Sequence, residues 1–308
     1  MTRVAAVDCG TNSVRLLVAE LDPAAGTSRD LARRMEIVRL GQGVDRTGRL
    51  DAGALERTLE ALRGYRKLAD DLGTESVRMV ATSATRDAAN RDDFVDGVHD
   101  VLGVEPEVIT GDEEARLSFL GATRELAGRA DVARPYLVVD IGGGSTEFVI
   151  GGTGVTACRS VNIGCVRLTE RHLRDDPPLP EQIEAATADI DAAIDTAAQA
   201  VPLLEAGALI GLAGTVTTVA GIAADLPEYD PDRIHHSRVT ATRVHEISTE
   251  LLGMRHAERA ALKVMHPGRV DVIGAGSLIL DRIAARVGLP EVLVSEHDIL
   301  DGIAWSEI

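Results

Sequence analysis

Residues 137–150 constrain the fold of this chain more than any other stretch, because an apolar strand pattern runs into three consecutive glycines and then into a second strand pattern. Glycines allow backbone conformations that a Cβ would block, so several N–H groups of the turn can point toward one oxygen-rich ligand. Asp140 and Glu147 flank the turn, and ionised carboxylates beside such a cradle suit a divalent cation. A phosphate with its metal ion fits this pattern, although the stretch alone also fits a tight hairpin with two solvated acids.

The same pattern occurs a second time near the N-terminus. Both copies consist of a short apolar strand, the sequence D-x-G-x-x-S and another strand. The spaced residues are Asp8, Gly10 and Ser13 in the first copy, and Asp140, Gly142 and Ser145 in the second. Recurrence of one supersecondary unit indicates a duplicated fold. We therefore predict two phosphate loops, residues 10–13 and 142–145, that face one cleft.

Length and composition agree with a duplicated globular protein. The chain has 308 residues, enough for two ordinary domains, and 45% of them are apolar and 26% charged. The sequence has neither a long apolar run nor a secretory leader pattern, so we expect a cytoplasmic protein. The three cysteines are odd in number and form no pair at metal spacing, so we expect neither a disulfide framework nor a zinc site formed by them, and we expect Cys9 and Cys158 to be buried free thiols.

The net charge of −17 limits the possible partners. Nucleic acids and anionic membranes need a basic surface, so neither is an expected partner. The only lysines are Lys67 and Lys263, and contacts to a polyanionic substrate would therefore fall to arginine, whose planar guanidinium grips two phosphoryl oxygens at once.

A polar string follows the strand that we predict over residues 76–82. Open α/β sheets bind ligands at the carboxyl ends of their strands. Arg86 lies in this string, which makes it a candidate for phosphate binding. The alternative is a solvated arginine at the start of a helix.

Three acids begin the helix that we predict over residues 112–126. Thr110 and Glu113 have the T-x-x-E spacing of a capping box, which gives Glu113 a structural role. Glu114 has no such role, and the helix dipole favours its ionised form. An ionised carboxylate near a phosphate can accept a proton from water. The alternative is that these acids only complement the dipole.

The second half of the chain holds further candidates. A third strand and glycine turn leads to Gly214 and Thr215, which can offer donors to a phosphate. Arg269 begins a later helix and is a second arginine candidate, again with a solvated arginine as the alternative. His235 and His236 have no third ligand at metal spacing, so we favour a solvated loop pair over a metal site. Breaker residues at 128–135 predict a boundary between domains 1–127 and 128–308.

The chain resembles the exopolyphosphatase/guanosine pentaphosphate phosphatase (Ppx/GppA) family of the actin, sugar-kinase and chaperone ATPase superfamily. The resemblance covers the whole chain. It rests on five motifs, VDCGTNSVRLL, TSATRDAANRDDF, TGDEEARLSFLGA, VVDIGGGSTEF and GLAGTVTTVAG, in that order. It implies an α/β fold of two ribonuclease-H-like (actin-like ATPase) domains with an interdomain cleft.

The resemblance also implies roles for individual residues. Glu114 matches the catalytic glutamate that activates the attacking water. Asp140 and Glu147, with Asp8 as a further candidate, match the acids around a catalytic Mg²⁺ or another hard cation such as Mn²⁺. The implied phosphate-binding residues are Gly10, Thr11, Asn12, Ser13, Arg86, Gly142, Gly143, Gly144, Ser145, Gly214, Thr215 and Arg269.

The expected activity is hydrolysis of the terminal phosphoanhydride of inorganic polyphosphate, with release of orthophosphate. A 5′-phosphohydrolase of guanosine pentaphosphate (pppGpp) is the alternative, and a kinase or an actin-like ATPase is a further one. The resemblance favours a homodimer. Longer family members carry an additional helical C-terminal region, which this chain stops before, so the preferred length of polyphosphate and processivity stay open.

Overall fold

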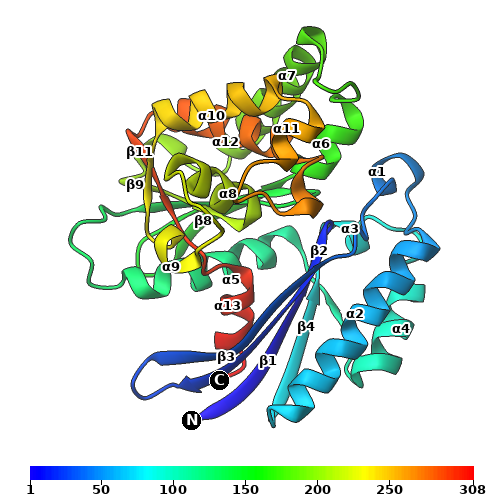
Figure 1. Cartoon of the computed structure of the whole chain (residues 1–308). Helices are drawn as coiled ribbons and strands as arrows, with labels where there is room; N and C mark the ends of the chain where they lie inside the picture. The colour runs from blue at the N-terminus through cyan, green and yellow to red at the C-terminus, as the bar shows by residue number, and fades with distance from the viewer. The chain divides into compact units, whose positions relative to one another are not determined.

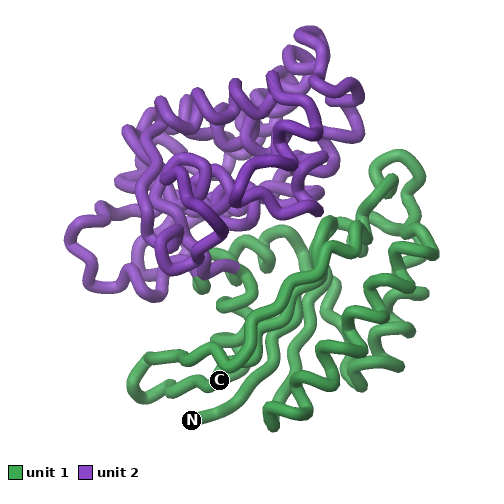
Figure 2. Tube along the Cα trace, in the orientation of Figure 1, with its two compact units in different colours: residues 1–121, 299–308 green, residues 122–298 purple.

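The computed structural model describes all 308 residues and divides them into two compact units. Figure 2 colours the units separately: unit 1 comprises residues 1–121 and 299–308, and unit 2 comprises residues 122–298. Each unit is built around one mixed β-sheet with helices packed against it, as Figure 1 shows.

Unit 1 contains a five-stranded sheet in the order β3-β2-β1-β4-β5. The first three strands form an antiparallel meander, and β4 and β5 then run parallel to β1. The strands are β1 (Thr2–Cys9), β2 (Ser13–Asp22), β3 (Thr27–Ile37), β4 (Ser76–Ala81) and β5 (Glu107–Val108). The helices are α1 (Val44–Thr47), α2 (Ala52–Asp71), α3 (Ser83–Arg86), α4 (Arg91–Leu102), α5 (Gly111–Thr123) and α13 (Ile299–Trp305).

Alternating residues of β1 face the two sides of this sheet, as expected for a strand buried on both faces. Ala5 and Val7 belong to a core that includes Leu62 of α2 and Phe94 of α4. Val4 and Ala6 belong to a separate core with apolar residues of α5 and α13. Helices therefore cover both faces of the unit 1 sheet (Figure 1).

Unit 2 contains a six-stranded sheet in the order β10-β11-β9-β6-β7-β8. Its strands are β6 (Tyr136–Ile141), β7 (Thr146–Gly151), β8 (Val155–Val161), β9 (Ala208–Leu212), β10 (Arg238–Thr240) and β11 (Glu291–Val294). Its helices are η1 (Arg124–Leu126), α6 (Cys165–Arg171), α7 (Pro180–Ala198), η2 (Leu203–Glu205), α8 (Ala213–Ala223), α9 (Pro231–Ile234), α10 (Ala241–Gly253), α11 (His256–Ala260), η3 (Pro267–Arg269) and α12 (Ile273–Val287). One large core joins the inner residues of the sheet to α7, α8, α10 and α12.

The two sheets share one topology, which confirms the duplication. Strands β8-β7-β6-β9-β11 repeat the order of β3-β2-β1-β4-β5, and β10 adds an antiparallel edge to the second sheet. In each sheet an antiparallel meander of three strands is followed by two parallel strands. The predicted α/β class with two ribonuclease-H-like domains is therefore confirmed.

The compact units differ from the predicted division at 127/128. The break falls between residues 121 and 122, and the last ten residues return to unit 1. The physical reason lies in α13, whose Ile299, Leu300 and Ile303 are buried in the same core as Val4 and Ala6 of β1. Burial of these apolar side chains stabilises the return of the C-terminus to the first sheet.

Candidate active site

The first loop, residues 10–13, forms a tight turn at the end of β1. The Gly10 N–H donates to the Ser13 carbonyl at 3.0 Å and closes the turn. The carbonyls of Thr11 and Asn12 accept hydrogen bonds from the segment after β3, where the Gly41 N–H lies 2.8 Å from the Thr11 oxygen. A Cβ at Gly41 would collide with the Thr11 side chain, so this close approach requires glycine.

The first loop is connected to the predicted arginine through α3. The hydroxyls of Thr11 and Ser83 lie 2.8 Å apart in a buried hydrogen bond. Ser83 begins α3, and Arg86 ends it. Arg86 Nη1 donates to the Ile109 carbonyl at 2.9 Å and to Glu114 Oε2 at 3.2 Å. Unit 1 thus brings its predicted phosphate loop, Arg86 and Glu114 into one chain of contacts.

Glu114 lies in the first turn of α5, as predicted. The Thr110 hydroxyl accepts from the Glu113 N–H at 3.2 Å, so Thr110 caps this helix. Glu114 is only 8% exposed. A nearly buried carboxylate needs a compensating charge, and Arg86 provides one. The pair holds the Glu114 carboxylate in a defined position.

Asp8 at the end of β1 forms an ion pair within unit 1. Arg15 Nη2 lies 2.7 Å from Asp8 Oδ2, and Arg15 Nε lies 2.9 Å from the same oxygen. Arg15 is also directly opposite Asp8 across β1 and β2. The Arg15 guanidinium already compensates the negative charge of Asp8, so the ion pair does not require a metal ion. Direct metal binding by Asp8 stays a prediction.

The second loop, residues 142–145, closes in the same way as the first. The Gly142 N–H donates to the Ser145 carbonyl at 3.0 Å. The start of α6 holds the loop, because the Cys165 N–H donates to Gly142 O at 3.0 Å and the Val166 N–H donates to Gly143 O at 2.9 Å. A Cβ at Gly164 would collide with the loop backbone at Gly143.

Asp140 and Glu147 lie directly opposite each other across β6 and β7. Asp140 is 7% exposed and Glu147 is 1% exposed. The Ser160 hydroxyl donates to Glu147 Oε1 at 2.7 Å. Like charges at directly opposite positions of a strand pair destabilise the sheet, and burial increases that cost. Two nearly buried carboxylates on one face therefore form an oxygen site that suits a hard divalent cation.

The turn before α8 carries the third group of predicted residues. The Arg269 guanidinium packs directly against Gly214, where a Cβ would collide with it. Arg269 Nη1 donates to the Thr218 hydroxyl at 3.3 Å. Thr215 hydrogen-bonds the Cys165 thiol. Burial raises the pKa of this thiol to about 11, and the positive charge of nearby Arg269 partly lowers it again. These contacts connect Arg269 and Thr215 to α6 and the second loop.

Each unit thus gathers its own predicted residues. Unit 1 joins loop 10–13, Arg86 and Glu114, and unit 2 joins loop 142–145, the acid pair, the α8 turn and Arg269. Sequence reasoning missed two arginines at these loops. Arg15 pairs with Asp8, and Arg167 Nε donates to the Gly144 carbonyl at 2.8 Å. The position of Arg15 could have been noticed, because it follows Asp8 by the same interval that separates Glu147 from Asp140.

The structure adds to the sequence interpretation of His235 and His236, because it brings further possible ligands to His235. Glu125 of η1 and His297 after β11 lie beside His235, and the donor atoms of Glu125, His235 and His297 are within 4.8 Å of one another. These partners are far away in sequence, so motif spacing could not reveal them.

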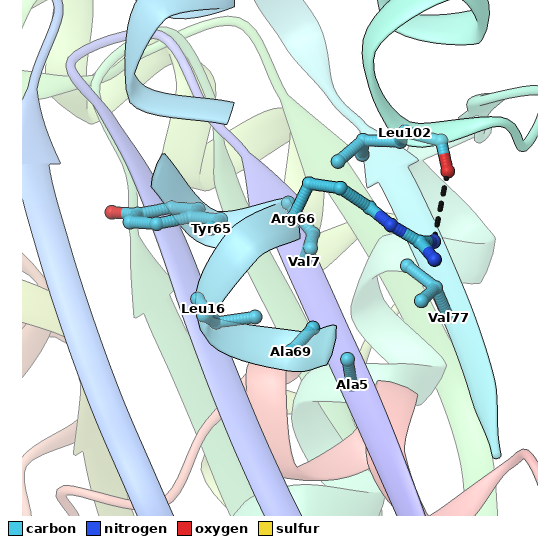
Figure 3. A pocket seen from close by; sticks show the side chains of 8 residues that line it. All are labelled: Ala5, Val7, Leu16, Tyr65, Arg66, Ala69, Val77 and Leu102. Carbon is cyan, nitrogen blue, oxygen red and sulfur yellow. Dashed lines mark hydrogen bonds between the residues drawn. The ribbon is translucent and has the colours of Figure 1, made fainter. Parts of the chain in front are cut away.

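A small apolar gap in unit 1 lies apart from these groups. Figure 3 shows it between the sheet, α2 and the end of α4, with Tyr65 and Leu16 among its lining residues. Arg66 Nη1 donates to the Leu102 carbonyl at 3.1 Å at its edge. The lining has no acid or nucleophile, and we interpret the gap as a seam in the helix–sheet packing.

Comparison with known proteins decides the family. The profile described as the Ppx/GppA phosphatase family matches residues 17–307. The chain belongs to the Ppx/GppA phosphatase family. The resemblance inferred from the motifs and the expectation of an enzyme are thereby confirmed.

Several Ppx/GppA relatives match over nearly the whole chain. "Exopolyphosphatase 2" of Mycobacterium tuberculosis is 49% identical, and the match covers 99% of this chain and 98% of the relative. A crystal structure described as an exopolyphosphatase-like protein is 44% identical with a TM-score of 0.95, covering 99% and 98% of the two chains. The guanosine-5′-triphosphate,3′-diphosphate pyrophosphatase of Aeromonas hydrophila is 28% identical over 98% of this chain and 58% of its own length.

None of the helices is both long and apolar enough to cross a membrane.

Proposed function

We propose that the protein is an exopolyphosphatase that releases orthophosphate from the end of inorganic polyphosphate. The observation that carries this proposal is the nearly buried Glu114 carboxylate, held by Arg86 beside the α3 connection to a phosphate loop. A base fixed next to a phosphate-binding turn suits attack of water on a phosphoanhydride. The near full-length identity of 49% to Exopolyphosphatase 2 supports polyphosphate as the substrate.

The acid pair of unit 2 fits a hard divalent cation, and we assign Mg²⁺ to Asp140 and Glu147. The fit rests on two directly opposed, nearly buried carboxylates on one face of the β6–β7 hairpin. When bound, Mg²⁺ neutralises charge on phosphoryl oxygens. Mn²⁺ would satisfy the same oxygen ligands.

Each group of residues has its own role in the proposed reaction. Glu114 orients the attacking water and accepts its proton. The backbone N–H groups of residues 11–13 and 143–145 bind phosphoryl oxygens, and their geometry is set before substrate binds because the Gly10 and Gly142 N–H groups close the two turns internally. Arg167 supplies positive charge at the second loop, and Arg269 supplies it at the turn before α8. Arg86 keeps the Glu114 carboxylate in place.

Hydrolysis of pppGpp at its 5′-phosphate is the alternative function. The same terminal phosphoanhydride chemistry serves both substrates, and a relative of 28% identity is named for the guanosine substrate. We rank polyphosphate first because the relative named for it is more similar and matches in length. We also propose that the protein is cytoplasmic and forms a homodimer. Sedimentation at micromolar concentration tests the oligomeric state.

The deciding experiment measures phosphate release in the presence of Mg²⁺ from short polyphosphate, long polyphosphate, pppGpp and ATP. Wild type, Glu114→Gln and the neighbouring Asp112→Asn are compared. Polyphosphate hydrolysis that is lost only in Glu114→Gln supports the proposal. Hydrolysis of pppGpp alone would reassign the substrate, and slow ATP turnover alone would return the assignment to a kinase or an actin-like ATPase.

A further inference from the structure

A cluster of three histidines and one glutamate lies in unit 2, separate from the residues assigned to phosphate chemistry. Glu125 Oε2 is 2.9 Å from His235 Nε2 and 3.4 Å from His297 Nδ1. The ring of His235 contacts the rings of His236 and His297, with centroids 3.7 Å and 4.5 Å away. The cluster combines three segments that are distant in sequence.

The geometry of the donor atoms suits a transition metal. All three donors of Glu125, His235 and His297 lie within 4.8 Å of one another. Zinc bonds of about 2.0–2.1 Å in a tetrahedron place donor atoms roughly 3.3 Å apart. The distances from Glu125 Oε2 to the two ring nitrogens are close to this spacing. Two imidazoles and one carboxylate also form a donor set that is common in zinc sites with an open fourth position.

The backbone holds the ligand segments in place. The His236 N–H donates to the Val294 carbonyl at 2.7 Å, which ties the His235 loop to β11. The His297 N–H donates to the Ser295 hydroxyl at 3.1 Å, which fixes the turn before His297. A site whose ligands are ordered in advance loses less conformational entropy on binding.

His236, whose ring lies against that of His235, is itself in an unusual state. His236 Nε2 is buried and has no hydrogen-bond partner, which is rare for a polar atom inside a protein. His236 also has φ of 59°, a strained value for a residue other than glycine. The side chains of Glu125, His235 and His297 are 48%, 20% and 28% exposed, so an ion and a coordinating water can reach them.

We infer that Glu125, His235 and His297 bind a borderline transition-metal ion such as Zn²⁺, with water in the fourth position. The mixed nitrogen and oxygen donors distinguish this site from the all-oxygen Mg²⁺ site proposed at Asp140 and Glu147. A bound ion cross-links η1, the segment after α9 and the segment after β11. Its expected effect is stabilisation of unit 2.

Metal binding has a defined consequence for His235. The Glu296 N–H donates to His235 Nδ1 at 3.1 Å, so the metal-free ring carries its proton on Nε2 and donates it to Glu125. A metal ion at Nε2 displaces that proton and takes the place of the bond to Glu125. The Glu296 N–H donates to Nδ1 of the same ring. Because a metal ion at Nε2 changes the electron density at Nδ1, the NMR resonance of the Glu296 amide should shift.

The experiment uses the full chain, stripped with a chelator and kept in excess Mg²⁺ so that the oxygen site is filled. Co²⁺ is titrated while the visible spectrum of tetrahedral Co²⁺ is recorded, and Zn²⁺ is titrated by calorimetry and thermal unfolding. The variants are His297→Ala and the milder Glu125→Gln. His99→Ala, an exposed histidine on α4, is the control for surface histidines.

Wild type and His99→Ala are expected to bind one ion and to unfold at a higher temperature with Zn²⁺. Loss of an outer-shell partner already weakens metal affinity by roughly 10–100-fold, so loss of a direct ligand should cost at least that much. Folded Glu125→Gln or His297→Ala that binds Co²⁺ as tightly as wild type, or an unchanged Glu296 resonance on addition of Zn²⁺, overturns the inference.

Discussion

Arg86 Nη1 lies 3.2 Å from Glu114 Oε2, so the predicted phosphate ligand is the ion-pair partner of the proposed base. The same nitrogen donates to the Ile109 carbonyl at 2.9 Å, which anchors the guanidinium to the segment before α5. Arg86 therefore acts on the Glu114 carboxylate as well as on any phosphate that it contacts. Removal of Arg86 should therefore affect catalysis through Glu114 as well as the binding of phosphate.

Replacement of Glu114 by Gln keeps the shape of the side chain and removes the base. We expect turnover of polyphosphate to fall by roughly 10²–10⁴, with KM nearly unchanged, because only the proton-accepting step is lost. Steady-state phosphate release measures both constants. Turnover within twofold of wild type would discard Glu114 as the base.

Replacement of Arg86 by Ala should lower kcat as well as weaken binding, because the Glu114 carboxylate loses the group that positions it. Arg86→Lys retains the charge but not the planar donors, so it should restore only part of kcat. A rise in KM with unchanged kcat would assign Arg86 to substrate binding alone. Arg269→Ala is the comparison variant. Arg269 contacts Thr218 and Gly214 in unit 2, and we expect its loss mainly to raise KM.

Mg²⁺ should stabilise the wild-type protein against heat, because a ligand that binds only the folded state raises the unfolding temperature. The increase should disappear in Asp140→Asn and in Glu147→Gln, which break the opposed carboxylate pair. Glu184→Gln, an exposed acid on α7, should keep the full increase. Equal Mg²⁺ shifts in all four proteins would place the ion elsewhere.

Gly302 in α13 allows close contact with α5, because a Cβ at this position would collide with the Leu117 carbonyl. Gly302→Ala should destabilise the protein by about 1–3 kcal/mol through overpacking. A Cβ at Gly64 in α2 would meet no neighbouring element within 4 Å, so Gly64→Ala should instead stabilise by about 0.5–1 kcal/mol. Urea unfolding measures both, and effects of the same sign would contradict the packing argument.

The three thiols should differ in reactivity. Burial raises the pKa of Cys165 to about 11 and raises that of Cys9 further, so neither forms thiolate near pH 8. Cys158 is only half-buried on β8, against the sequence expectation, because the outer face of this strand is partly exposed. An aromatic disulfide reagent at pH 8 should modify one thiol of the native protein, and Cys158→Ser should remove that reaction. Rapid modification of all three would contradict the assigned burial.

The sequence by itself determined the local turns and helix caps of this protein. Both D-x-G-x-x-S turns close through the same hydrogen bond, and Thr110 caps the helix that carries Glu114, because short-range spacing dictates turns and caps. The order of strand and helix patterns was also sufficient for the duplicated fold.

Only the tertiary structure decided which distant groups meet. The pairing of Arg86 with Glu114, the return of α13 to the first sheet, and the meeting of Glu125 with His235 and His297 join segments that no spacing rule connects. Such contacts depend on how whole elements pack, and packing is set by the combined burial of many side chains rather than by any local pattern.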